Sequence, residues 1–397
     1  MHLLYYVYVS FPKAKRDRMN TPTNRTWVLD RRGFLRVAAT AGVAATAVAL
    51  GGCETYGEVV TGERTIVDDA NRELRIHAAD KLERIYFTSG LAQVWVFSLN
   101  PDKQGGTSAQ FSARQREFLP EGIADLEYMG AIGENASIDT EMLAEQDIQL
   151  VFSISGIGLT EGNISDAERL QEQTGIPVVL VDGSFDRIAT AYRFVGDIMG
   201  EQERAEELAT YCEQKFAEVT AAVAQVPEEE KVRLYYAEGV EGLQTDPPTS
   251  QHALTFELAG AINVADCGQR AWGMTQVDME RVLSWDPEVI IAWDEEEGGC
   301  DETIRQGAEW QHVKAVRNNQ VFRMPMLPFS WCDRPPGVNR LIGIMWVANL
   351  LYPTYYNVDM VEVTKEFYKT MYWADITDDQ ARELLSNSYP PPEKIKR

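Results

Sequence analysis

One supersecondary pattern occurs twice in this chain at a constant offset of 139 residues. The first copy runs from Ile138 to Phe152 and the second from Val277 to Ile291. Each copy consists of an apolar residue, Asp, any residue, Glu, a short helical pattern, a second Asp and an apolar strand. Two copies of one supersecondary unit indicate a duplicated architecture, so the repeat predicts two similar lobes.

Both lobes are predicted to be α/β. Residues 65–76 (TIVDDANRELRI) alternate around Asp-Asp-Ala-Asn, which indicates a β-hairpin, and residues 82–87 indicate the strand that follows. Helical patterns then alternate with short apolar runs. The predicted strands in these runs are Leu150–Ile154, Pro177–Val181, Arg233–Ala237, Val289–Trp293 and Gln320–Met324. Strands separated by helical segments are typical of parallel α/β units.

A helical stretch, residues 186–226, lies between the two copies and is interrupted at Met199-Gly200. Its second part, residues 201–226, would be about 39 Å long at 1.5 Å per residue. That length bridges two lobes, and a rigid connector of this kind permits only small hinge motions. The predicted division of the chain is a signal peptide with lipobox 1–53, a tether 54–63, an N-terminal α/β lobe 64–186, connecting helices 187–226, a C-terminal α/β lobe 227–375, and a C-terminal helix and polar tail 376–397.

The N-terminal segment has the pattern of an export signal. A twin-arginine run (residues 30–36, DRRGFLR) is followed by the apolar stretch 37–50 and by Gly51-Gly52-Cys53. The apolar stretch is too short to span a bilayer, and the pattern is that of a bacterial Tat lipoprotein signal. We therefore expect an exported protein anchored by lipid on Cys53 to the outer face of the cytoplasmic membrane. Met1 and Met19 are both open as the start of translation.

The net charge of the chain limits the classes of partner that it can bind. Residues 1–52 hold eight basic and two acidic side chains, which leaves 29 basic and 59 acidic ones and a net charge of −30 in the remainder. Such a surface repels phosphate backbones and anionic lipid heads, so we expect no nucleic-acid partner and membrane attachment through the lipid alone. The part after the signal has too few cysteines for a disulfide scaffold, and the pairing of Cys212, Cys267, Cys300 and Cys332 is left open.

The sequence predicts neither an enzyme nor a metal site. It contains no nucleophile elbow, no Walker loop, no GxGxxG and no haem CxxCH. His77, His252 and His312 show no ligand spacing, so no metal and no cofactor are expected. A lone histidine such as His252 is more often solvated or locally bonded than functional. The alternative from another class is a Tat-exported enzyme.

The chain resembles the periplasmic solute-binding lipoproteins of ABC importers for iron-siderophore, haem and cobalamin. The resemblance covers about residues 64–373 and lies in the opening hairpin, in residues 277–295 (VDMERVLSWDPEVIIAWDE) and in the segment 309–353, from EWQHV to LLYP. It implies the class III, helical-backbone periplasmic-binding fold: two Rossmann-like lobes joined by one long helix, with ligand in the cleft between them. It also implies a monomer that delivers an iron(III) chelate, in the first place a ferric siderophore, to a permease and its ATPase. Haem, cobalamin and a molybdate-type oxyanion are the alternatives.

The resemblance further implies one acidic docking residue for the permease on each lobe. The matching positions are Glu141 and Glu280, the two glutamates of the repeat. Acids in the first turn of a helix are also favoured by the helix dipole alone, so a purely local role has equal standing.

Candidate ligand contacts follow from the rule that parallel α/β sheets bind ligands at the carboxyl ends of their strands. Aromatic side chains there offer flat apolar surface for a bulky chelate, and an arginine followed by two prolines offers a directed guanidinium for an anion. Arg334 could instead pair with Asp333 and only brace its loop, and Trp272 and Trp293 could be core residues. The predicted ligand contacts are Ser89, Ser155, Phe185, Tyr236, Trp272, Trp293, Trp331 and Arg334.

Overall fold

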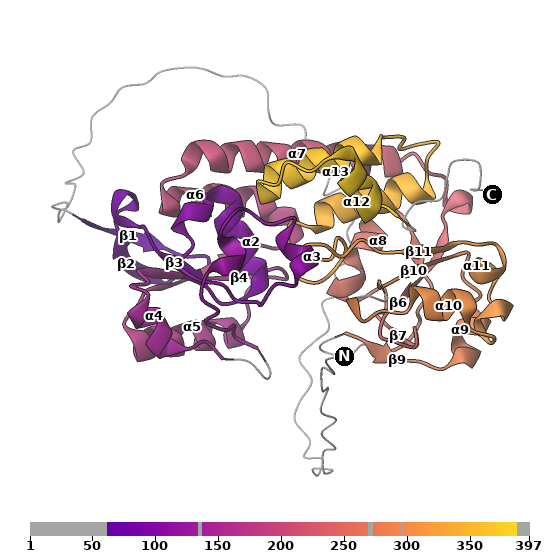
Figure 1. Ribbon diagram of the computed structural model, residues 1–397, viewed down its shortest axis with the longest axis horizontal. Helices are drawn as coiled ribbons and strands as arrows, with labels where there is room; N and C mark the ends of the chain where they lie inside the picture. The colour runs from indigo at the N-terminus through magenta and orange to yellow at the C-terminus, as the bar shows by residue number, and fades with distance from the viewer. Residues whose placement is uncertain (1–61, 134–136, 269–272, 295–296, 387–397) are drawn as a thin grey trace, which may run out of the picture. The chain divides into compact units, whose positions relative to one another are not determined.

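The chain folds around two separate parallel β-sheets, each followed along the chain by helices (Figure 1). The computed structural model describes residues 62–133, 137–268, 273–294 and 297–386, all of which belong to one compact unit. The first sheet has the order β3-β4-β5 and the second has the order β11-β10-β6-β8. Every neighbouring pair of strands within these two sheets is parallel. The prediction of a mixed α/β fold with parallel sheets is therefore confirmed.

The first half begins with a hairpin, as the sequence predicts. Strand β1 pairs with β2 in antiparallel register, and the turn between them is held by Asp68, whose carboxylate accepts hydrogen bonds from the backbone N–H groups of Ala70 and Arg72. The strand predicted over residues 82–87 is shorter in the structure. The elements of this half are β1 (Glu63–Val67), β2 (Glu73–His77), β3 (Ile85–Phe87), α2 (Gly90–Leu99), α3 (Ala113–Arg116), α4 (Thr140–Glu145), β4 (Leu150–Ser155), α5 (Glu161–Thr174) and β5 (Val178–Asp182).

The second half continues the same alternation. Two short strands, β7 and β9, pair antiparallel beside the second sheet. Its elements are β6 (Arg233–Ala237), β7 (Gln244–Thr245), α8 (Leu254–Leu258), β8 (Ile262–Asn263), β9 (Thr275–Gln276), α9 (Met279–Trp285), β10 (Val289–Ala292), α10 (Asp301–Gln306), α11 (Lys314–Arg317), β11 (Val321–Arg323), α12 (Arg340–Leu351), α13 (Met360–Tyr372) and α14 (Asp378–Leu384).

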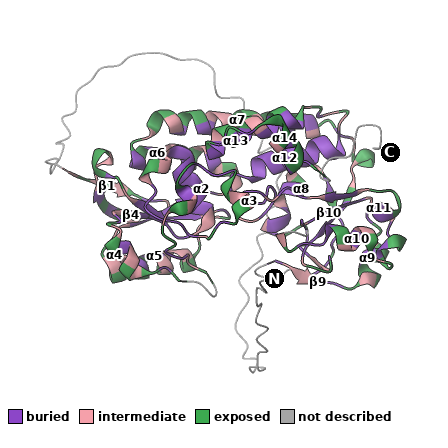
Figure 2. Ribbon diagram, viewed as in Figure 1, coloured by how far each residue is buried: buried purple, intermediate pink, exposed green. Residues whose placement is uncertain are grey.

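Two helices connect the halves. Helix α6 (Ile188–Met199) ends at Gly200, whose φ of 78° is the left-handed conformation that favours glycine, and α7 (Gln202–Val223) follows at once. With 22 residues α7 is about 33 Å long. Helix α12 packs against α7, α8 and α13, and all of its residues are buried, as the purple ribbon in Figure 2 shows. The lobe boundaries given above stay predictions.

The repeat found in the sequence is a repeat of structure. Asp139 caps α4 and Asp278 caps α9, each accepting hydrogen bonds from backbone N–H groups in the first turn of its helix. Asp147 and Asp286, again 139 residues apart, both adopt positive φ, 51° and 41°, just before the next strand. The two units thus share cap, helix, left-handed turn and strand.

Replacing the cap Asp278 by alanine is expected to lower the free energy of unfolding by about 1 kcal/mol. Its Oδ1 accepts the Arg281 N–H at 2.8 Å, and alanine leaves that donor to water. Asp278→Ser is the matched control, because a serine hydroxyl can accept the same bond. Urea denaturation of the three proteins measures the effect, and equal losses in both variants would contradict the capping role.

Candidate functional site

The carboxyl ends of the second sheet carry a buried network of charged and aromatic side chains. Tyr236 and Glu238 come from the end of β6, Trp293 follows β10, and Asp333 and Arg334 lie in the loop between β11 and α12. Parallel strands bring their carboxyl ends to one edge, which is why residues almost 100 positions apart converge there. Tyr236, Glu238 and Asp333 are all fully buried.

Arg334 is held from two sides. Its Nη2 donates to Glu238 Oε1 at 3.2 Å, and its Nε lies 3.1 Å from Asp333 Oδ2. The guanidinium carbon lies 5.4 Å from the centroid of the Trp293 ring, which is cation–π distance. Burial lowers the pKa of Arg334, but Asp333, Tyr236 and Glu238 more than offset it, so the pKa lies above its ordinary value. One third of the side chain remains exposed, so a braced cation still faces outward.

Asp333 is the centre of the network. One of its oxygens contacts the Nδ1 of His252, and the other accepts from the Tyr236 hydroxyl at 3.3 Å. Tyr236 in turn accepts the Trp293 indole N–H at 2.6 Å. Burial, then the charges of Asp333 and Glu238, raise the pKa of the Tyr236 hydroxyl well above its ordinary value, so this hydroxyl keeps its proton. This series of contacts, from Trp293 through Tyr236 and Asp333 to His252, fixes the orientation of the Trp293 ring over which Arg334 lies.

Two further buried charges complete this region. Arg340 donates from Nη2 to the Gln251 carbonyl at 2.6 Å, and burial lowers its pKa to about 10. Burial also raises the pKa of Glu238 well above its ordinary value, and the negative charges of Asp333 and Asp246 add to that effect. The carboxyl ends of the second sheet therefore hold several ionisable groups whose pKa values are shifted by burial. Such shifted groups are common at functional sites.

The first sheet presents smaller polar groups. Ser89 caps α2 at the end of β3, its Oγ accepting the Ala92 N–H at 3.3 Å, and Ser155 at the end of β4 donates to the Gly158 carbonyl at 2.6 Å. Both are partly exposed. Phe185 follows β5 but packs edge-to-face on Phe216 of α7, with ring centroids 5.0 Å apart.

The two halves meet at a glycine. A Cβ atom on Gly156, directly after β4, would lie 2.2 Å from the Pro336 carbonyl oxygen and 3.0 Å from Leu91. On the same side Gln115 donates to the Pro328 carbonyl at 3.0 Å. The end of the first sheet thus reaches the loop that carries Arg334.

The predicted contacts do not all lie at this edge. Trp331 is fully buried, and its indole N–H donates to Tyr368 of α13 at 3.1 Å, so it packs in the core among helices. Tyr236 lies beneath Trp293 rather than at the surface. Trp272 lies outside the described residues, as does Cys53. Glu141 and Glu280 are exposed in the first turns of α4 and α9.

Sequence reasoning missed the buried acids Glu238 and Asp246 and the bond between His252 and Asp333. Both acids stand beside apolar or proline residues, in Tyr-Tyr-Ala-Glu and Asp-Pro-Pro, but this local pattern does not distinguish a buried acid from one that begins an exposed loop. The four cysteines whose pairing was open are all buried, and they form no disulfide with one another.

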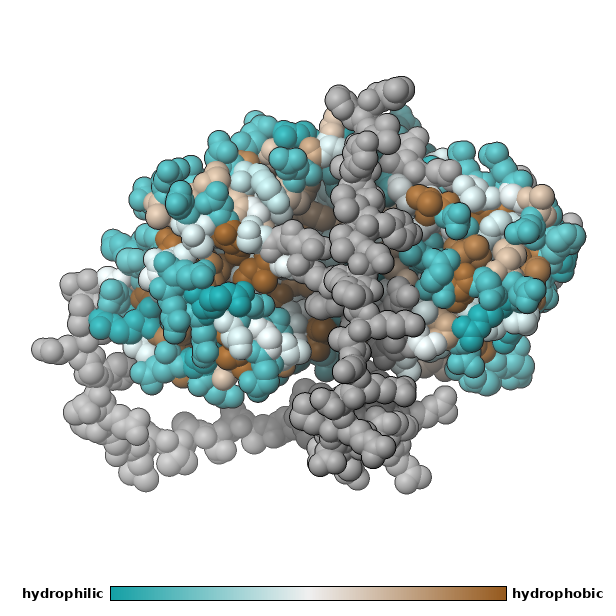
Figure 3. Space-filling view, turned by 90° about the horizontal axis from the view of Figure 1, so that it is seen from below, coloured by the Kyte–Doolittle hydropathy of each residue, from teal (hydrophilic) through white to brown (hydrophobic). Residues whose placement is uncertain are grey.

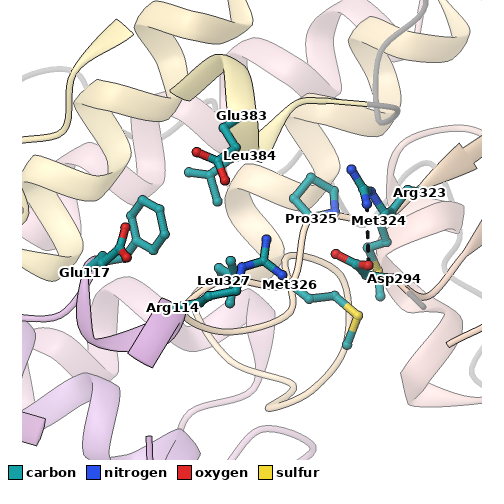
Figure 4. Close-up of a pocket in the computed structure, with 11 residues that line it drawn as sticks. Arg114, Glu117, Asp294, Arg323, Met324, Pro325, Met326, Leu327, Glu383 and Leu384 are labelled. Atoms are coloured by element: carbon teal, nitrogen blue, oxygen red, sulfur yellow. Dashed lines mark ion pairs between the residues drawn. The ribbon is translucent and has the colours of Figure 1, made fainter. Parts of the chain in front are cut away.

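A pocket opens between α3, the end of β11 and α14 (Figure 4). Its arginines are already engaged: Arg323 lies 3.5 Å from Asp294 and donates to the Ser386 carbonyl, and Arg114 lies 3.8 Å from Glu297. Because the pocket is also lined by Glu117 and Glu383, it is a poor place for an anion.

Comparison with known proteins gives one family. The sequence model described as "Periplasmic binding protein" matches residues 121–326. The molybdate-binding protein MolA of Haemophilus influenzae is 26% identical over 199 residues, which cover 49% of this chain and 54% of MolA. The matched region thus spans about half the length of that curated relative.

Solved structures match over more of the chain. An ABC transporter solute-binding protein from Sulfurospirillum deleyianum has 26% identity and a TM-score of 0.73 and covers 81% of this chain and 99% of its own. MolA of H. influenzae, solved with molybdate bound, has 20% identity and a TM-score of 0.61, covering 79% and 99%. All of these relatives are named as binding proteins, in agreement with the prediction that the chain is not an enzyme. Among the residues that the structure describes, no helix is both long and apolar enough to cross a membrane.

Proposed function

Because this chain belongs to the periplasmic binding protein family of ABC importers, we propose that it captures an iron(III) chelate, of the ferric siderophore kind, and delivers it to a permease. The chelate lies between the carboxyl ends of the two sheets. The observation that carries the proposal is Arg334, a one-third exposed guanidinium held by two buried carboxylates and lying over Trp293. A braced cation on an aromatic ring suits a large ligand with a flat apolar part and an anionic part.

We assign the ligand contacts to those predicted side chains that are at least partly exposed. Trp293 supplies apolar surface and Arg334 the charge, while Ser89 and Ser155 offer hydroxyls from the first sheet. Tyr236 acts from below, by fixing the Trp293 indole. Lipid attachment at Cys53 keeps the chain at the outer face of the membrane, near the permease.

Molybdate is the second candidate. The relative MolA carries that name and has been solved with molybdate bound. A small oxyanion needs several donors within a narrow space, whereas Arg334 already directs its Nη2 to Glu238 and its Nε towards Asp333. A large chelate needs only the exposed face of the guanidinium. The geometry therefore favours the chelate.

Calorimetric titration of the protein tests this assignment. The ligands are a ferric hydroxamate, a ferric catecholate, haemin, cyanocobalamin, molybdate and tungstate. We expect tight one-to-one binding of at least one ferric siderophore and none of molybdate. Tight binding of molybdate or tungstate alone would overturn the chelate and leave the importer role intact.

Docking on the permease is proposed to use Glu141 and Glu280. Both are exposed at equivalent places of the structural repeat, and α4 and α9 lie on the same side of the unit in Figure 1. Seen from that side, much of the surface on both halves is hydrophilic (Figure 3). Two matched negative points of this kind can meet two basic groups of a permease.

Changing either glutamate to glutamine is expected to weaken binding to the permease about tenfold, the lower end of the range for close interfacial charge pairs. Affinity for the chelate should not change. Glu161→Gln is the matched control, because Glu161 is also exposed in the first turn of a helix, α5. Surface plasmon resonance against the reconstituted permease measures the effect; wild-type binding by the Glu141→Gln, Glu280→Gln double variant would exclude this docking surface.

A further inference from the structure

Beneath Arg334, three buried side chains converge, and two of them, His252 and Asp333, belong to the network described above. Asp246, His252 and Asp333 each offer a ligand atom, and these atoms all lie within 4.8 Å of one another. The exposed fractions of the three residues are 0%, 7% and 0%. They come from different loops, after β7, before α8 and after β11, so the fold itself assembles them.

Two oxygens in this cluster lack a partner. Glu238 Oε2 and Asp246 Oδ1 are buried and accept no hydrogen bond within the described part of the chain. Both residues are fully buried, so water does not satisfy them from outside. Since unpaired buried carboxylate oxygens are costly, acids that face each other are stabilised by a proton held between them, as between Glu238 and Asp246, or by a cation beside them.

The backbone approaches these donors closely. A Cβ atom on Gly273 would lie 2.7 Å and 3.0 Å from the two carboxylate oxygens of Asp246 and 3.0 Å from the His252 ring. Gly273 also has a φ of 74°. A glycine at this position lets the Asp246 carboxylate and the imidazole share one space.

From this geometry we propose that Asp246, His252 and Asp333 bind one divalent transition-metal ion, with Glu238 beside it. One imidazole nitrogen with carboxylate oxygens is a donor set for Zn²⁺, Mn²⁺ or Fe²⁺, whereas Ca²⁺ and Mg²⁺ prefer oxygen alone. Around an ion with metal–ligand bonds of about 2.0–2.2 Å, two donors lie further apart than the His252 and Asp333 atoms that now contact each other, so this pair would open to admit the ion. The ion is a resident part of the second half and not the cargo, because the site lies buried behind Arg334.

The ion would also change the local field. A divalent ion would add two positive charges beside the guanidinium groups of Arg334 and Arg340. In a chain with a formal net charge of −24, it would make this edge attractive to an anionic ligand.

Metal titration in the absence of any chelate ligand tests the site. The protein is dialysed against a chelator and titrated with Zn²⁺ and, separately, Mn²⁺ by calorimetry, and metal content is measured by mass spectrometry. We expect one equivalent of ion per chain. Asp246→Asn and His252→Gln should each weaken binding by about 100-fold or more. His312→Gln, the same change at an exposed histidine, should bind as wild type.

Circular dichroism shows whether each variant is folded, and Glu238→Gln, which keeps the side-chain shape, serves if His252→Gln is not. Failure of the wild type to bind either ion would overturn the site. So would wild-type affinity in folded Asp246→Asn and His252→Gln. Binding of an ion only together with a chelate would assign the metal to the cargo and equally exclude a resident ion.

Discussion

Replacing Asp333 by alanine is expected to lower the free energy of unfolding by about 3–5 kcal/mol. Asp333 is fully buried and contacts three side chains, those of His252, Tyr236 and Arg334. Its removal leaves Arg340, which is 1% exposed and has two guanidinium nitrogens without a described partner, in an uncompensated site. Breaking a buried pair by deleting one member is costly because the other charge stays buried.

Chemical denaturation followed by tryptophan fluorescence and circular dichroism measures this loss. Asp375→Ala is the matched control, since the Asp375 side chain is 85% exposed, and it should change stability by less than about 0.5 kcal/mol. A loss for Asp333→Ala no larger than that of the control would mean that the network does not brace the second half.

Arg334→Gln is expected to weaken binding of the ferric siderophore about 100-fold. A hydrogen bond to a charged group contributes about 1.5–3 kcal/mol, and tenfold in affinity corresponds to 1.4 kcal/mol. Glutamine keeps much of the side-chain length but carries no charge and cannot lie as a cation over Trp293. Arg334→Lys should bind with intermediate affinity, because it restores charge without the planar fork.

The measurement is calorimetric titration with the siderophore bound most tightly by the wild type. Arg317→Gln, at an exposed position at the end of α11, controls for loss of surface charge. Melting temperatures separate a binding defect from loosening of the loop. If folded Arg334→Gln bound the siderophore as tightly as the wild type, Arg334 would be a brace only, which is the alternative that its sequence context leaves open.

Much of the fold was predictable because local patterns of apolar residues in the sequence determine it. The predicted strands over residues 150–154, 233–237 and 289–293 agree with β4, β6 and β10 to within one residue at either end. Apolar runs of this length bounded by helical segments have few other solutions in an α/β chain. The family inferred from residues 277–295 and 309–353 is confirmed by the match over residues 121–326.

The site was less predictable because it depends on which side of a loop faces inward. Trp331 and Arg334 stand three residues apart in one loop, yet the former packs on Tyr368 in the core and the latter lies over Trp293 near the surface. From the sequence, both residues were predicted to contact the ligand. Only the packing of α12 and α13 against the loop distinguishes them.

The buried acids were missed for a related reason. Glu238 follows directly on an apolar strand, where a charged residue usually marks the start of an exposed loop. Its burial depends on Arg334, almost 100 residues later, folding back over it. A pairing over that distance leaves no trace in local periodicity.

Gly156 has a consequence for how relatives of this protein differ. Its missing side chain lets the Pro336 carbonyl approach to a distance that even a methyl group would forbid. The absence of a side chain at this position therefore sets how closely the two halves of the protein approach each other. In a homologue that carries alanine or valine here, the two halves must lie further apart, and the ligand that fits between them should be correspondingly larger.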